Sequence, residues 1–75
     1  MNGGRSDTSA VSGFLRDAAL SGVSAWTVVN VLRAWMKDGV SRATIDCGLE
    51  EVRTALPSHD ALLEDYRVLI QVTLR

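Results

Sequence analysis

The sequence predicts an all-α fold, a compact bundle of four short helices. Three observations support this: a pattern that recurs about every 17 residues along the 75-residue chain, a capping residue at the start of each repeat, and apolar residues spaced three and four apart within it. Apolar positions with this spacing form one face of a helix, and that face must be buried. Hydrophobic residues make up 47% of the chain, which suffices for a globular core.

The repeat is clearest in three segments, GVSAWTVVNVLRAWMKD, GVSRATIDCGLEEVRTA and LPSHDALLEDYRVLIQV, and fainter in RSDTSAVSGFLRDAALS. The third residue of each segment is a good N-cap: Asp7, Ser24, Ser41 and Ser58. A side-chain oxygen there accepts a hydrogen bond from the first helical turn and stabilises the helix by about 1 kcal/mol. Gly22, Gly39 and Pro57 stand where the preceding helix is expected to stop.

These signals predict four helices and a short tail. The helices span residues 8–21, 25–38, 42–55 and 59–73, residues 1–6 form a disordered N-terminal tail, and residues 7–75 form a single domain. Because the loops contain only two or three residues, we expect sequential helices to pack as neighbours and to cross steeply.

Each helix is predicted to bury one face, found by placing residues at 100° per step. Val29 flanks the face of the second helix, which we expect to be the most enclosed, and Gly48 in the third permits close approach of a neighbour. The predicted core is Val11, Phe14, Leu15, Ala18, Ala19, Val28, Val31, Leu32, Trp35, Met36, Ile45, Leu49, Val52, Ala55, Leu56, Leu62, Leu63, Tyr66, Leu69 and Ile70.

The C-terminal segment YRVLIQVTLR carries a competing signal. Residues 66–74 are rich in β-branched side chains and alternate in hydrophobicity, as a strand does. SHDALLED before it is a sound helix start, and no second strand is predicted elsewhere to pair with this one. We therefore predict a helix; a strand donated to a partner's sheet is the alternative.

Composition argues against an enzyme and against a membrane protein. The chain has one cysteine, one histidine and a net charge of −1. These residues supply no internal disulfide, no metal or cofactor site and no nucleophile–base set, and no glycine loop cradles phosphate. No secretory signal or membrane-spanning run is visible, so a cytoplasmic location is expected. Ser24 resembles the modified serine of acyl carrier proteins, but that family's Asp-Ser-Leu is Val23-Ser24-Ala25 here.

The string GVSRATI, Gly39 to Ile45, resembles the helix-turn-helix of GntR-like and LacI-like repressors. The resemblance implies that Arg42, Ala43 and Asp46 face a DNA groove. Other residues depart from the pattern. Trp35 occupies a position at the turn where a small residue is usual, and Asp46 is joined by Glu50 and Glu51, which would repel phosphates. Since GVSAWTV is a twin of this string, helix punctuation explains both, and a DNA-binding transcription regulator is kept as the alternative function.

The favoured function is a small non-enzymatic protein-interaction module, such as an adaptor, an inhibitor, or an immunity or antitoxin-type partner. Surplus apolar surface on the second and fourth helices suggests it. The candidate partner-binding residues are Trp26, Asn30, Arg33, Lys37, Val68 and Val72. Trp26 either folds over a neighbouring helix or anchors a partner. Val68 and Val72 are either buried as the flanks of a central helix or exposed for another protein, with a homodimer as one form of that contact.

Overall fold

A computed structural model describes the backbone of residues 3–74 and the side chains of residues 8–74. It confirms the all-α fold, since the described chain forms helices and no strand. The elements are α1 (Gly3–Ser21), α2 (Ala25–Lys37), α3 (Arg42–Ala55), a 3-10 turn η1 (Pro57–His59) and α4 (Asp60–Thr73). The C-terminal segment is therefore a helix, and the α3 bounds equal those predicted. Residues 3–6 of the predicted tail lie in the first turn of α1, and Met1 and Asn2 lie outside the described residues.

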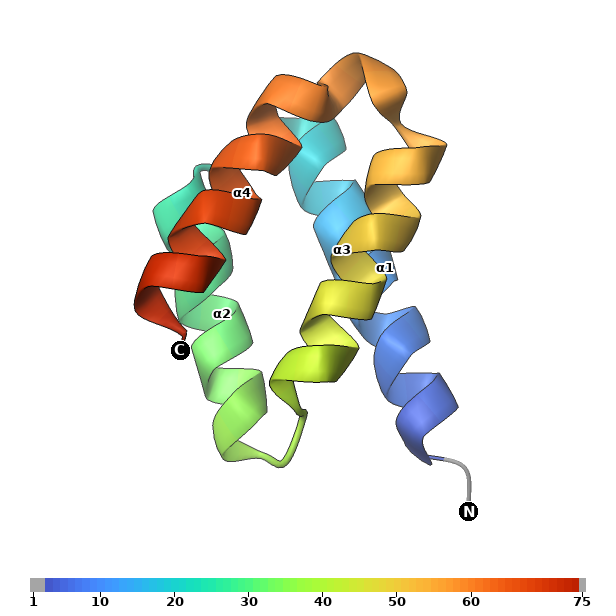
Figure 1. Cartoon of the computed structure of the whole chain (residues 1–75), viewed down its shortest axis with the longest axis vertical. Helices are drawn as coiled ribbons and strands as arrows, with labels where there is room; N and C mark the ends of the chain where they lie inside the picture. The colour runs from blue at the N-terminus through green and yellow to red at the C-terminus, as the bar shows by residue number, and fades with distance from the viewer. Residues whose placement is uncertain (1–2, 75) are drawn as a thin grey trace.

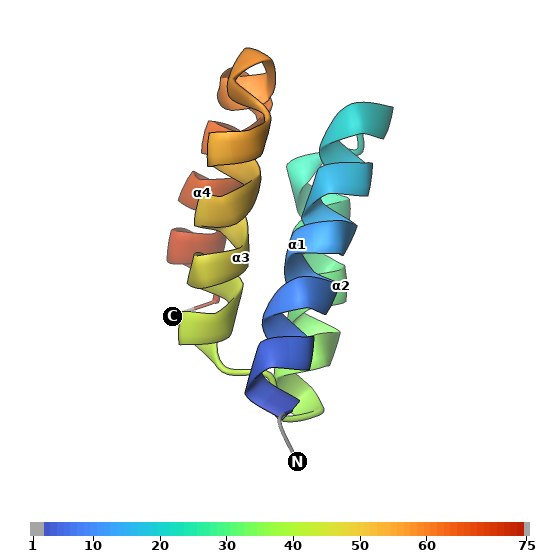
Figure 2. The same ribbon diagram turned by 90° about the vertical axis from the view of Figure 1, so that its right-hand side faces the viewer.

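The four helices form two layers, with α1 and α3 in one and α2 and α4 in the other (Figures 1 and 2). Within each layer the two helices run in the same direction, because each is separated from its partner by one helix of opposite direction. A smaller contact joins α3 to α4. The radius of gyration is 11.3 Å, against about 11 Å for a compact chain of this length.

The main contacts join α1 to α3 and α2 to α4 rather than the sequential helices that we expected to pack as neighbours, although α1 and α2 still touch through Phe14 and Trp35. Side-chain size explains the difference. Between α1 and α2 the rings of Phe14 and Trp35 meet with their centroids 5.4 Å apart, and two large rings keep the backbones apart. Where α3 meets α1 the contact residue of α3 is Gly48, which has no side chain, so the backbones approach closely. A Cβ on Gly48 would lie 2.6 Å from Val11 Cγ1.

The two Gly-Val-Ser strings are helix punctuation, as predicted. Gly22 and Gly39 have φ angles of +73° and +111°, and each glycine and the valine after it close the preceding helix as a Schellman motif. The hydrogen bonds are Gly22 N to Ala19 O (3.2 Å), Val23 N to Ala18 O (2.9 Å), Gly39 N to Met36 O (3.1 Å) and Val40 N to Trp35 O (3.1 Å). Ser24 and Ser41 then cap α2 and α3, accepting from Thr27 N and Thr44 N.

The other two predicted caps are wrong. Ser58 lies inside η1, where its hydroxyl contacts only the adjacent His59 ring, and α4 starts at Asp60 without a side-chain cap. The preceding residue is Pro57 rather than a glycine, so no left-handed residue turns the chain and a 3-10 turn forms instead. Asp7 lies within α1, which begins four residues earlier.

The buried core draws on all four helices. Of the predicted core residues, twelve are buried, Ala55 is exposed and the others are half-buried. Val29, predicted on a flank, is fully buried, and Leu74 is buried although it follows the last helix. The buried apolar residues are Val11, Leu15, Ala18, Ala19, Val28, Val29, Leu32, Ile45, Leu49, Val52, Leu63, Tyr66, Ile70 and Leu74.

Two side chains tie distant parts of the chain together. Tyr66 is the largest fully buried side chain, and its hydroxyl donates to Val23 O at 2.6 Å, so α4 is fixed to the turn between α1 and α2. Arg42 donates to Leu74 O at 2.7 Å, so the start of α3 holds the end of α4. A cation is favourable at a helix C-terminus, where unpaired carbonyls face it. No helix in the range 3–74 has both the length and the apolar character needed to cross a bilayer.

Candidate protein-binding surface

The predicted partner-binding residues of α2 form one straight row on its outer side. Trp26, Asn30, Arg33 and Lys37 are all exposed, and their spacing of four, three and four residues places them on one face of the helix. We call these four residues the α2 stripe. Trp26 does not fold over a neighbouring helix, since 63% of it is exposed. The half-buried Trp35, which contacts α1, points to the opposite side of α2.

The predicted residues of α4 lie in a similar row. Val68 is 45% exposed and Val72 58%, so α4 does not bury both flanks. Ala61 and Asp65 continue the row toward the start of the helix, and both are exposed. We call Ala61, Asp65, Val68 and Val72 the α4 stripe. The structure therefore places both stripes on the layer formed by α2 and α4 (Figure 1).

Exposed large apolar side chains are concentrated on this layer. Trp26, Val68 and Val72 are three of the four in the described chain, and α3 carries none. The fourth is Leu20, near the end of α1, which sequence reasoning missed. Leu20 lies outside the apolar face of its helix, and this position could have predicted its exposure.

The cations of the α2 stripe differ from the other described cations in having no described carboxylate partner. Arg16, Arg42, Arg53 and Arg67 each lie within 4 Å of a carboxylate, whereas Arg33 and Lys37 of the α2 stripe have no such partner among the described residues. Arg53 bridges α3 to Asp60 and Glu64 of α4 at 3.2 and 3.5 Å. Hydrogen bonding from Arg67 lowers the pKa of Glu64 despite partial desolvation, and the charge of Arg53 acts in the same direction.

The outer face of α3 is acidic. Asp46, Glu50 and Glu51 are exposed there. Arg42, which a helix-turn-helix would direct at DNA, instead pairs with Asp46 at 3.1 Å and donates to Leu74 O. Of the residues that the repressor resemblance would aim at a groove, only Ala43 and Asp46 are exposed, and neither can neutralise a phosphate.

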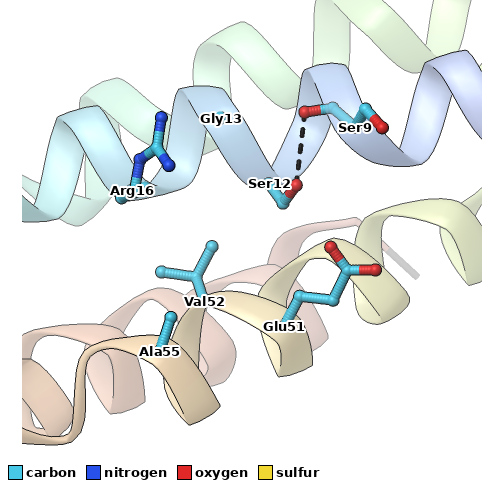
Figure 3. A pocket seen from close by; sticks show the side chains of 7 residues that line it. All are labelled: Ser9, Ser12, Gly13, Arg16, Glu51, Val52 and Ala55. Carbon is cyan, nitrogen blue, oxygen red and sulfur yellow. Dashed lines mark hydrogen bonds between the residues drawn. The ribbon is translucent and has the colours of Figure 1, made fainter.

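A shallow groove of about 230 Å³ lies between α1 and α3 (Figure 3). Its polar groups do not converge. Ser12 donates to the backbone oxygen of Ser9, Arg16 points away from α3, and Glu51 points toward α1. The rest of the lining is Gly13, Val52 and Ala55. Such a groove offers no set of groups that could orient a substrate.

A second hollow, of about 310 Å³, lies beside the α2–α3 turn and is lined by Ala10, Trp35, Asp38, Gly39 and Val40. One carboxylate is its sole charged group. Cys47 is exposed on α3, and no group of three histidine, cysteine, aspartate or glutamate side chains comes together within the described residues. The α2 and α4 stripes are thus the strongest candidate site.

Comparison with protein-family models, with curated proteins and with solved structures found no match to this chain.

Proposed function

We propose that this chain is a small non-enzymatic protein-interaction module, an adaptor, an inhibitor or an immunity or antitoxin-type partner. It binds another protein through the α2 and α4 stripes. The observation that carries the proposal is the exposure of Trp26, 63% of which faces solvent on a regular helix. Tryptophan and arginine are enriched among residues that dominate binding energy, and Arg33 lies two turns along the same row.

The α4 stripe supports the same proposal. Val68 and Val72 are exposed on the helix that packs beside α2, although a domain this small gains stability from each apolar side chain that it buries. Their exposure is therefore more easily understood if another protein covers them. A second copy of the chain is one such protein, and the experiment below distinguishes it.

The alternative, a DNA-binding regulator, receives less support. Its recognition helix would be α3, whose exposed face carries Asp46, Glu50 and Glu51. Phosphate binding requires several cations on one face, and Arg42 is already engaged by Asp46 and Leu74 O.

The test is capture of a partner from lysate of the native host by the immobilised chain, quantified by mass spectrometry. We expect Trp26→Ala to reduce capture of the specific partner by tenfold or more, as loss of a hot-spot tryptophan does. Val68→Asp should do the same. Thr54→Asp, an exposed position on α3, is the matched control and should capture normally.

Circular dichroism must show that all variants keep the helicity of the parent chain. A captured set that does not change in Trp26→Ala and Val68→Asp would refute the proposal. Recovery of the chain itself, lost in the same two variants, would identify the partner as a second copy.

A further inference from the structure

The α2 stripe carries two cations that pair with no carboxylate among the side chains described, residues 8–74. Arg33 and Lys37 are exposed and lie one turn apart, and no described carboxylate is within 4 Å of either. Asp38 follows Lys37 directly in the sequence, yet the two make no ion pair. Elsewhere each described arginine has a carboxylate partner, so the α2 stripe is the one helix face in residues 8–74 where positive charge is free.

The same stripe begins with an apolar anchor. Trp26 precedes Arg33 by seven residues and Lys37 by eleven, which at 1.5 Å per residue are axial distances of about 10 Å and 16 Å. Asn30 lies between them and offers both a donor and an acceptor. A ligand for this row would therefore pair an apolar group at one end with negative charge about two to three helical turns away.

We infer that the α2 stripe binds an acidic amphipathic segment of the partner, a helix or extended peptide that places an apolar side chain on Trp26 and carboxylates beside Arg33 and Lys37. This inference rests on the proposed function, because it names the chemistry of the partner at the same surface. Helical segments are commonly recognised through anchors spaced three, four and seven residues apart, and opposite charges across an interface fix its register.

Nucleic acid fits the stripe less well. Two cations neutralise two phosphates at most, and each contributes about one unit to the salt dependence of binding. Asp38, at the C-terminal end of α2 and next to Lys37 in the sequence, adds an exposed carboxylate that would repel a phosphate. An anionic membrane meets the same limit, since a surface helix that binds lipid needs a broad apolar face beside its cations.

A second copy of the chain fits less well too. The face with complementary charge is the outer side of α3, which carries Asp46, Glu50 and Glu51. In the two-layer arrangement α3 lies in the layer opposite α2 (Figures 1 and 2). Pairing α2 of one copy with α3 of another would be a head-to-tail contact. It would leave α3 of the first copy and α2 of the second unpaired, whereas most small oligomers close by two-fold symmetry.

The test selects ligands from random peptides, so the partner need not be identified first. The full chain is immobilised and screened against random 16-residue peptides displayed on phage, and selected peptides are synthesised and titrated by fluorescence anisotropy. We expect aspartate and glutamate to be enriched in the selected peptides, together with an aromatic residue or leucine. Affinity should fall by about tenfold or more in Arg33→Glu and in Lys37→Glu, because like charges then face each other.

Arg16→Glu is the matched control, since it reverses an exposed arginine on α1, outside the stripe, and should bind normally. Selection of peptides without acidic enrichment, or none at all, would overturn the inference. So would a duplex DNA or phosphatidylserine vesicles that bind the chain and lose binding in Arg33→Glu, or concentration-dependent self-association lost in that variant. If Trp26→Ala abolishes capture from the host while the peptides show no acidic bias, the inference fails and the proposed function stands.

Discussion

Gly48→Ala is the sharpest test of how the two helices of one layer meet. An alanine Cβ at this position would lie 2.6 Å from Val11 Cγ1, 3.0 Å from Val11 Cβ and 3.1 Å from the backbone nitrogen of Ser12. Val11 is fully buried and its branched side chain has little χ1 freedom, and the Ser12 nitrogen belongs to the backbone. The contact is therefore relieved only if α1 and α3 separate.

Two effects of opposite sign decide the result. Alanine is the better helix former by about 1 kcal/mol, whereas an extra carbon forced into a packed core costs about 1–3 kcal/mol. We expect overpacking to prevail, because two of the three close contacts cannot be removed by rotating a flexible side chain. The net loss should be up to about 2 kcal/mol, which lowers the melting temperature by up to about 16 °C for a domain of this size.

Gly13→Ala is the matched control. Gly13 also lies in a helix, but an added Cβ there meets nothing within 4 Å, so the substitution should stabilise the chain by up to about 1 kcal/mol. Urea unfolding followed by circular dichroism measures both variants. Val11→Ala should partly rescue Gly48→Ala in the double variant. The reasoning is refuted if Gly48→Ala is as stable as Gly13→Ala.

Three further predictions concern the buried tyrosine and the helix caps. Tyr66→Phe should destabilise the chain by about 1–2 kcal/mol in urea unfolding, because the carbonyl of Val23 loses its 2.6 Å donor; no change would show that water replaces it. Burial raises the pKa of Tyr66, so its neutral form favours folding, and stability should fall once the pH exceeds the unfolded value of about 10. Absorbance at 295 nm follows the ionisation of this sole tyrosine. If Tyr66 ionises with a pKa of about 10 while the chain keeps its helicity, the predicted link between its burial and stability is wrong. Ser41→Ala should cost about 1 kcal/mol in thermal melts, whereas Ser58→Ala should be neutral, since Ser58 caps no helix; equal losses would refute the cap assignment.

The sequence predicted the helices well because their signals are local. Ser24, Ser41 and the two left-handed glycines act within one turn of the chain, so the bounds of α2 and α3 could be placed to within one residue. The sequence alone could not show that Ser58 does not cap a helix. Whether Pro57 leads into an α-helix or a 3-10 turn depends on how α4 packs, and the sequence does not display that packing.

The pairing of the helices could not be predicted for a similar reason. Short loops constrain where helices start, but the separation of their axes depends on which side chains meet. Phe14 meets Trp35, and Gly48 meets Val11, and each pair is separated by many residues. The positions of Trp26 and Val68 outside the apolar faces of their helices can be read from helical periodicity alone, and both side chains are exposed.

The α2 stripe as a protein-binding surface is tested most directly by photo-crosslinking in the native host. A photoreactive phenylalanine analogue replaces Trp26 in one variant and Thr54, on the exposed side of α3, in another. We predict a discrete adduct with one other protein from position 26 and none of that mass from position 54. No adduct at position 26, or the same adducts from both positions, would contradict the assignment of this surface.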